Sequence, residues 1–102
     1  MAIMEISIVP IGTKTTSVSK YVAIAVKIIK SKKLKYKLCP MGTVVEGKID
    51  ELFDIAEQMH ESVFKAGLFR VVTNIKIDDR RDIKSSMDKK VLSVRKKLRN
   101  RK

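Results

Sequence analysis

The sequence predicts an α+β fold: a ferredoxin-like split β-α-β-β-α-β sandwich, in which two helices cover one face of a four-stranded antiparallel sheet, with a basic helix added at the C-terminus. Two observations predict it. Stretches with alternating apolar residues begin and end the body of the chain, and two stretches with apolar residues at helical spacing lie between them, on either side of a proline-containing turn. The 102 residues are enough for one domain.

The first strand and the first helix are the clearest elements. Met4, Ile6 and Ile8 alternate with polar residues, which is the period of a half-buried strand, and a proline and a glycine then end the run. A helix is predicted over residues 18–32, where apolar residues recur every three or four positions. Ser17 is its expected N-cap, and lysines at its far end complement the helix dipole.

The middle of the chain predicts a hairpin and a second helix. Two apolar runs, 35–39 and 42–46, flank a turn that contains Pro40, as expected for a tight antiparallel pair. A helix follows over residues 49–66, with acidic residues in its favourable first turn and a glycine after its end. Alternation returns over residues 70–78 and predicts the fourth strand.

A third helix is predicted after a charged turn. Its apolar residues Met87, Val91, Val94 and Leu98 fall at steps of four, three and four, which is a narrow stripe suited to docking onto another surface. We therefore divide the chain into a ferredoxin-like body, residues 1–82, and a C-terminal basic helix, residues 83–102, that packs on the body or on a neighbouring subunit.

One face of the predicted sheet is left without helices. The residues expected there mix valines with polar groups, which favours pairing with another subunit or with the third helix. They are Glu5, Ser7, Val9, Thr43, Val45, Arg70, Val72, Asn74 and Lys76. We expect a homo-oligomer, most simply one built of dimers.

Composition limits the class of protein. With 44% hydrophobic and 33% charged residues the body should fold, and the single cysteine, Cys39, excludes an internal disulfide. No apolar run approaches the ~20 residues of a membrane-spanning helix, and no basic region precedes the first apolar stretch as in a signal peptide. We expect a cytoplasmic protein without a membrane partner.

The net charge of +12 is concentrated in the tail, because residues 84–102 carry nine basic side chains against one acid, Asp88. A nucleic-acid or protein-interaction module that uses the basic helix is therefore the alternative function. Yet aromatic residues make up only 5% of the chain, whereas single-strand binders of this fold stack bases on sheet aromatics. Nucleic acid is not the expected partner.

Glu46 is the one carboxylate of the third predicted strand. Gly42, Val44 and Glu46 share one face of that strand, with Thr43 and Val45 on the other, so Glu46 points at the helices if Val44 does. A carboxylate there is costly unless it is paired or hydrogen-bonded. Either it reaches solvent or caps the second helix, or it accepts hydrogen bonds from a polar or cationic ligand between sheet and helices, where Thr43 could add a hydroxyl.

A cluster of hydroxyl residues precedes the first helix and could hold a phosphate or the polar edge of a ligand, or simply form a capped loop. It comprises Thr13, Thr15, Thr16, Ser17 and Ser19. His60 has no second histidine or cysteine near it in sequence, and no metal-ligand spacing or catalytic pairing is visible. We therefore expect a protein that is not an enzyme and needs no cofactor.

Four segments carry a family resemblance: "EISIVPIGT", "TSVSKYVAIAVKIIK", "YKLCPMGTVVEGKIDELF" and "RVVTNIKIDDRRD". Together they resemble the small thiamine-binding protein family of about a hundred residues. The resemblance covers nearly the whole chain, and "PMGT…EG" and "IDDRRD" are its more specific parts. It implies a ferredoxin-like fold, dimers that pair into tetramers, and binding of thiamine or its hydroxymethylpyrimidine portion without catalysis.

The resemblance also implies a site. Carried onto this chain, the ligand-binding residues are Thr16, Ser17, Ser19, Met41, Thr43 and Glu46. Glu46 would pair with the cationic thiazolium or accept a proton of the pyrimidine amino group. Arg80, Arg81 and Asp82 of "IDDRRD" are expected to form an ion-paired subunit contact rather than to touch the ligand.

Overall fold

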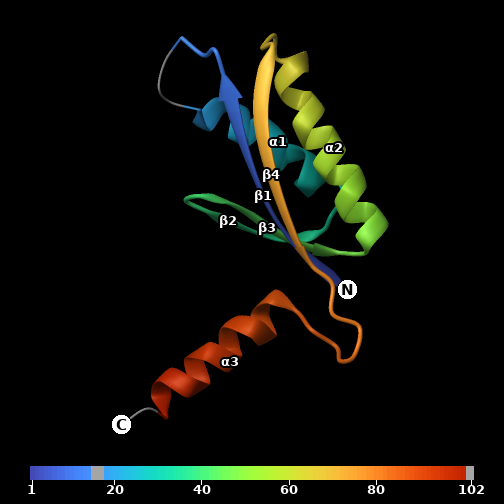
Figure 1. Cartoon of the computed structure of the whole chain (residues 1–102), viewed down its shortest axis with the longest axis vertical. Coiled ribbons are helices and arrows are strands. Elements are labelled where there is room, and N and C mark those ends of the chain that lie inside the picture. The colour runs from blue at the N-terminus through green and yellow to red at the C-terminus, as the bar shows by residue number, and fades with distance from the viewer. Residues whose placement is uncertain (15–17, 101–102) are drawn as a thin grey trace.

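The computed structural model describes residues 1–14 and 18–100 and confirms the predicted order of elements (Figure 1). The elements are β1 (Ala2–Ile11), α1 (Ser19–Ser31), β2 (Lys35–Cys39), β3 (Gly42–Gly47), α2 (Ile49–Lys65), β4 (Arg70–Asp78) and α3 (Met87–Arg99). No helix among the described residues is long and apolar enough to cross a membrane.

The four strands form one antiparallel sheet in the order β2-β3-β1-β4. β1 is central: its Ile6 lies opposite Thr43 of β3 on one side and opposite Ile75 of β4 on the other. The sheet therefore has two edges, the short β2 and the nine-residue β4. This is the split βαβ arrangement that the sequence predicts.

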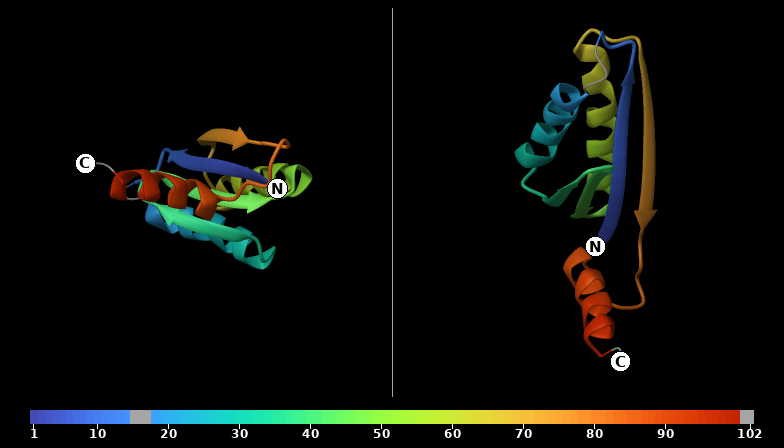
Figure 2. Two further views of the ribbon diagram at one scale, coloured as in Figure 1. Left: turned by 90° about the horizontal axis from the view of Figure 1, so that it is seen from below. Right: turned by 90° about the vertical axis from the view of Figure 1, so that its left-hand side faces the viewer.

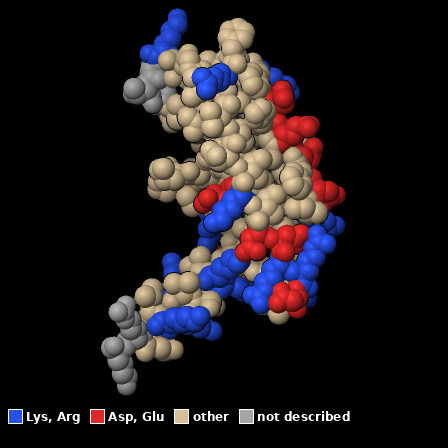
Figure 3. Space-filling view, in the orientation of Figure 1, with Lys and Arg blue, Asp and Glu red and all other residues tan. Residues whose placement is uncertain are grey.

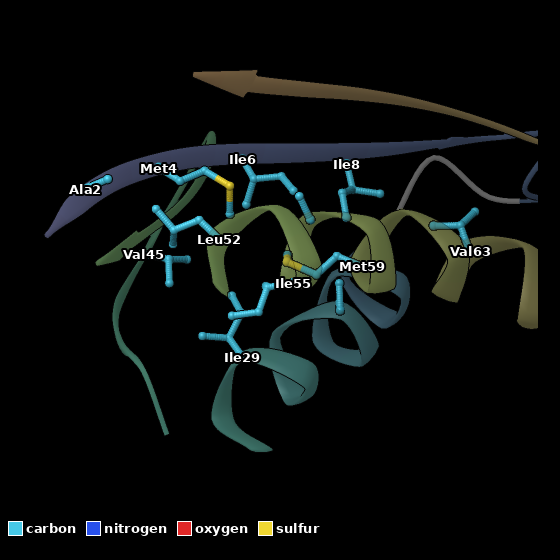
Figure 4. Close-up of a cluster of buried hydrophobic side chains, with 12 residues drawn as sticks. Ala2, Met4, Ile6, Ile8, Ile29, Val45, Leu52, Ile55, Met59 and Val63 are labelled. Atoms are coloured by element: carbon cyan, nitrogen blue, oxygen red, sulfur yellow. The ribbon is translucent and has the colours of Figure 1, made fainter. Parts of the chain in front are cut away.

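Both α1 and α2 lie on the same face of the sheet, as Figure 2 shows. The alternation of β1 explains this packing, because Met4 and Ile6 are buried to within 1% of full burial while Glu5 between them is exposed. They pack with Ile29 of α1 and Leu52 of α2 in one core cluster (Figure 4). Burying each such side chain contributes about 1.5–3 kcal/mol to folding.

The two faces of β3 are the reverse of the expected arrangement. Thr43 and Val45, expected on the open face, are 3% and 0% exposed and point at the helices, whereas Val44 and Glu46 lie on the opposite face. The register gives the reason: Val45 lies opposite Met4, and residues directly opposite in an antiparallel pair share a face.

The ends of the helices differ in how they are capped. The side chain of Glu51 accepts a hydrogen bond from the backbone N–H of Lys48 at 3.1 Å, which closes a capping box at the start of α2, and Gly67, at φ +96°, follows its end. α1 has Val18 at its N-cap position and no side-chain cap bond. Ser17, the predicted cap, lies outside the described residues.

α3 leaves the body of the molecule after its first turn. Met87 is 4% exposed, but Val94 and Leu98 further along the helix are 58% and 62% exposed. Figure 1 shows the helix projecting away from the sheet, and the radius of gyration is 15.5 Å, against the ~13 Å of a compact chain of this length. The fold alone leaves most of α3 uncovered.

Candidate functional site

A cavity of about 210 Å³ lies on the helix-covered side of the sheet, between α1, β1 and the turn that joins β2 to β3. Most of its wall is apolar, and the buried Thr43 supplies a hydroxyl group. Residues of its wall include Ile6, Ile8, Val22, Ala25, Pro40 and Thr43. Figure 4 shows Ile6 and Ile8 of β1 pointing from the sheet toward the helices that close this side.

Gly42 allows the wall of the cavity to form at the start of β3. A Cβ atom at this position would lie 3.1 Å from the backbone oxygen of Ile6, which is tighter than ordinary van der Waals contact. Glycine therefore permits the close approach of β3 to β1 beside the Pro40 turn. This explains why the specific "PMGT" run has a glycine directly before the threonine that lines the cavity.

The cavity continues into a wider outer groove of about 840 Å³ that runs along α1 and the β2–β3 hairpin. The two spaces share Val18, Val22, Val26, Leu38, Cys39 and Pro40. Lys27 and Lys30 of α1 line the outer groove, and no carboxylate is among the described residues that line either space. The cleft is therefore apolar in its depth and positively charged at one part of its rim.

Three of the predicted site residues lie at this cleft. Thr43 and Met41 line the inner cavity, where Met41 is 89% exposed at the turn, and Ser19 lines the outer groove at the start of α1. Thr16 and Ser17 lie outside the described residues.

Glu46 does not join this group, because it lies on the opposite face of the sheet. Its Oε1 accepts a hydrogen bond from the backbone N–H of Met87, the first residue of α3, at 3.1 Å. A carboxylate at a helix N-terminus satisfies a free N–H and interacts favourably with the helix dipole. In this structure Glu46 caps α3, which neither interpretation of the sequence had foreseen.

Charged side chains hold the first turn of α3 around this cap. The Asp88 carboxylate pairs with the ammonium groups of Lys35 and Lys37 on β2, and Lys90 pairs with Asp78 at 2.6 Å. Hydrogen bonds from Lys35 and Lys37 lower the pKa of Asp88, and Asp88 in turn raises the pKa of Lys35. All of these partners lie on β2, β4 and α3, away from the cleft.

The "IDDRRD" turn is internally ion-paired. Arg81 pairs with Asp79 at 2.7 Å and Arg80 with Asp82 at 2.6 Å, and each arginine lowers the pKa of its partner carboxyl. The predicted ion pairing is thus present within the turn. Its predicted use as a subunit contact stays a prediction.

Three apolar residues of α1 belong to the cleft but not to the predicted site: Val18, Val22 and Val26. They recur at intervals of four residues, so they form one line along the helix. Val18 and Val22 are among the apolar positions at helical spacing that predict this helix. No signal in the sequence separates the three valines from core residues, because Ala25 and Ile29, which are 1% and 0% exposed, form a neighbouring apolar line toward the core and Ala25 also lines the cavity.

No group of three or more metal-ligating side chains occurs within residues 1–14 and 18–100. His60 sits at the α2–β4 contact, where its Nδ1 and the hydroxyl of Thr73 are 2.8 Å apart and its ring packs edge-on against Phe64. This contact ties α2 to the sheet, and neither residue lines the cavity or the groove, although Thr73 lies directly opposite the wall residue Ile8.

Comparison with known proteins places the chain in a family. A family model described as "Thiamine-binding protein" matches residues 4–95. The UPF0045 protein YqgV of Bacillus subtilis is 49% identical, over 96% of this chain and 98% of its own length, and a UPF0045 protein of Methanothermobacter thermautotrophicus is 42% identical, over 96% and 100%.

Two solved structures have the same fold as this chain. Hypothetical protein MJ1052 of Methanocaldococcus jannaschii superposes with a TM-score of 0.85 at 38% identity, covering 91% of this chain and 94% of that one. A domain of unknown function from Bacillus cereus gives 0.81 at 30% identity, covering 94% and 91%. The family model and these relatives together show that the chain belongs to the thiamine-binding protein family.

Proposed function

We propose that the protein binds thiamine or its hydroxymethylpyrimidine portion in the cleft beneath α1, without catalysis. The observation that carries the proposal is the 210 Å³ cavity, with its apolar wall and the buried Thr43 hydroxyl. Membership of a family described as thiamine-binding supports the choice of ligand. Apolar walls with a few placed polar groups are typical of small-molecule sites.

The size of the inner cavity favours one ring over two. Sites for drug-sized ligands occupy about 300–1,000 Å³, and the inner cavity is smaller than that range. We place the pyrimidine ring in the inner cavity, where the Thr43 hydroxyl can exchange a hydrogen bond with a ring nitrogen or the amino group. The rest of a larger ligand would lie in the outer groove, past Met41 and Ser19.

The positive charge of the outer groove predicts an order of affinity among the three ligands. Thiamine has a permanent cation on its thiazolium ring, and Lys27 and Lys30 line the groove that this ring would enter. Like charges repel, although water weakens the effect at an exposed site. We therefore expect hydroxymethylpyrimidine to bind more tightly than thiamine. Thiamine phosphate should have an affinity between the two, because its negative phosphate can interact with these lysines.

Glu46 has no direct role in the site as we propose it, because its carboxylate lies on the other face of the sheet and caps α3. Thr16 and Ser17 stay predicted contributors from the start of α1. We further propose that the protein acts in the cytoplasm as a homo-oligomer, built of dimers, that carries or buffers its ligand with no cofactor.

Isothermal titration calorimetry tests the proposal. Folded, ligand-free protein is titrated with hydroxymethylpyrimidine, thiamine and thiamine phosphate. The proposal predicts saturable binding of about one ligand per chain, and Val22→Trp, which fills the inner cavity, should abolish it. Ser31→Trp, at an exposed position of α1 that lines neither the inner cavity nor the outer groove, is the matched control. Absence of heat with all three ligands would refute the proposal.

A further inference from the structure

α3 is a helix that requires a partner. It has 13 residues, and isolated helices of that length are marginal in water. Six of its residues are basic and one is acidic, so repulsion along the helix weakens it further. Within residues 1–14 and 18–100, only its first turn has hydrogen bonds or ion pairs to the body, through Glu46, Asp88 and Lys90.

The surface that α3 presents has a definite shape. Met87, Val91, Val94 and Leu98 fall on one side, and the last three are 39–62% exposed. Such a narrow stripe suits packing along another helix or a helix–strand groove. Lys90, Arg95 and Lys97 flank the stripe, so a second α3 would bring like charges together.

The α2–β4 flank matches this stripe in both apolarity and charge. Phe53, His60 and Phe64 lie along one side of α2, where Phe53 is 57% and Phe64 38% exposed. His60 contacts Thr73, which places this side of α2 next to the edge strand β4, whose Ile75 is 45% exposed. We define the α2–β4 flank as Phe53, His60, Phe64 and Ile75.

Carboxylates border the α2–β4 flank. α2 has five acidic residues and one lysine, a net charge of −4, whereas α3 has six basic residues and one acid, a net charge of +5. Glu57 and Glu61 of α2 follow the aromatic side of the helix and are exposed. Figure 3 shows this segregation, with red side chains along one margin of the body and blue side chains over the projecting helix.

The open sheet face is a poorer match for α3. Its basic residues include Lys35, Lys37, Arg70 and Lys76, and two of its carboxylates, Glu46 and Asp78, already contact α3 of the same chain. With Glu5 as its third carboxylate, this face has four basic and three acidic residues, a net charge of +1, so a cationic helix from a second copy would find no excess of negative charge there.

We propose that α3 of one copy docks its apolar stripe on the α2–β4 flank of a second copy. α3 cannot pack on the α2–β4 flank of its own chain, because Glu46 anchors it on the face of the sheet opposite α2. In a symmetric pair, each α3 covers the other copy's flank. The inference does not depend on which ligand the cleft binds.

Sedimentation velocity of paired variants tests the contact. Val94→Asp places a charge in the stripe and should weaken association at least tenfold, and Phe53→Asp should do the same from the other side. Ser93→Asp adds the same charge to α3 outside the stripe and should leave the sedimenting mass unchanged. An assembly that survives both Val94→Asp and Phe53→Asp would overturn the proposal.

Cysteine cross-linking identifies the contacting surfaces. In a Cys39→Ser background, chains carrying Leu98→Cys are mixed with chains carrying Phe53→Cys and oxidised. A covalent pair with one chain of each kind is expected. Cross-linking of Leu98→Cys to Val72→Cys on the open sheet face instead, or oligonucleotide binding that requires α3 in a monomeric protein, would overturn the proposal. Val94→Asp should leave ligand titration intact, so a failure here is distinct from a failure of the proposed ligand site.

Discussion

The carboxylate of Glu46 accepts a hydrogen bond from the backbone N–H of Met87, with 3.1 Å between Oε1 and N. The two residues are 41 positions apart, and their contact joins the end of β3 to the start of α3. The sequence suggested that Glu46 and Thr43 contact one ligand, but the structure places them on opposite faces of the sheet. The carboxylate next to the specific "PMGT" run holds a helix, while Thr43 of the same strand faces the cleft.

Replacing Glu46 should loosen α3 without affecting ligand binding. Glu46→Ala removes a cap interaction, a change that costs about 1 kcal/mol at a helix end, so amide hydrogen exchange in the first turn of α3 should accelerate severalfold. Glu5→Ala, on the same face of the sheet, is the control and should leave that exchange unchanged. A tenfold loss of affinity for hydroxymethylpyrimidine in Glu46→Ala would return Glu46 to the binding site.

Replacing Thr43 should weaken ligand binding and leave α3 unchanged. Thr43→Val keeps the shape of the buried side chain and removes its hydroxyl, so binding of hydroxymethylpyrimidine should weaken by about 1 kcal/mol, the usual net value of one hydrogen bond. Calorimetric titration measures the change. Thr73→Val removes a hydroxyl from the same sheet at a residue that lines neither the cavity nor the groove, and it should bind normally. Equal affinity for wild type and Thr43→Val would exclude the hydroxyl from recognition.

Neutralising the rim lysines should change ligand preference. In the double variant Lys27→Gln and Lys30→Gln, thiamine should gain affinity relative to hydroxymethylpyrimidine, because its cation no longer meets positive charge. The effect should shrink as salt is raised. Competition titrations at low and high salt give the ratio. An unchanged ratio at low salt would place the thiazolium outside the groove.

Low pH should break the ion pairs of Asp88 that hold the first turn of α3 against β2. Hydrogen bonds from Lys35 and Lys37 lower the pKa of Asp88 below its ordinary value of 3.8. A carboxyl with a lowered folded-state pKa contributes stability that is present above the ordinary pKa and is lost as the pH falls through the folded-state value. NMR titration should therefore show the α3 amides losing protection as the pH falls below 3.8. In Asp88→Asn this acid-dependent step should disappear; its persistence would assign it to another group.

The fold could be predicted from the sequence because each element has a strong local signal. β1 alternates cleanly, and α2 has an acidic first turn and a terminating glycine. The facing of β3 could not be predicted, because "GTVVEG" has valines at adjacent positions and either could face the core. Its register with Met4 of β1 settles the matter, and that is a contact between distant residues.

The site was predictable only in part, for the same physical reason. Met41 lies in the β2–β3 turn and Thr43 follows it, and the family resemblance of the "PMGT" run pointed to both as ligand-binding residues, which both line the cavity. The valines of α1 that complete the cleft have the same character as core residues and differ only in which side of the helix they occupy. The partner of Glu46 depends on where α3 returns to the sheet, which no local pattern specifies.

The most direct test of the central claim is a crystal structure of the protein grown with hydroxymethylpyrimidine. The account predicts electron density for the pyrimidine ring between α1 and the β2–β3 turn, with a polar ring atom within hydrogen-bond distance of Thr43 Oγ1 and Glu46 still bonded to Met87. Density for the ligand on the opposite face of the sheet, against Glu46, with the inner cavity empty, would contradict it.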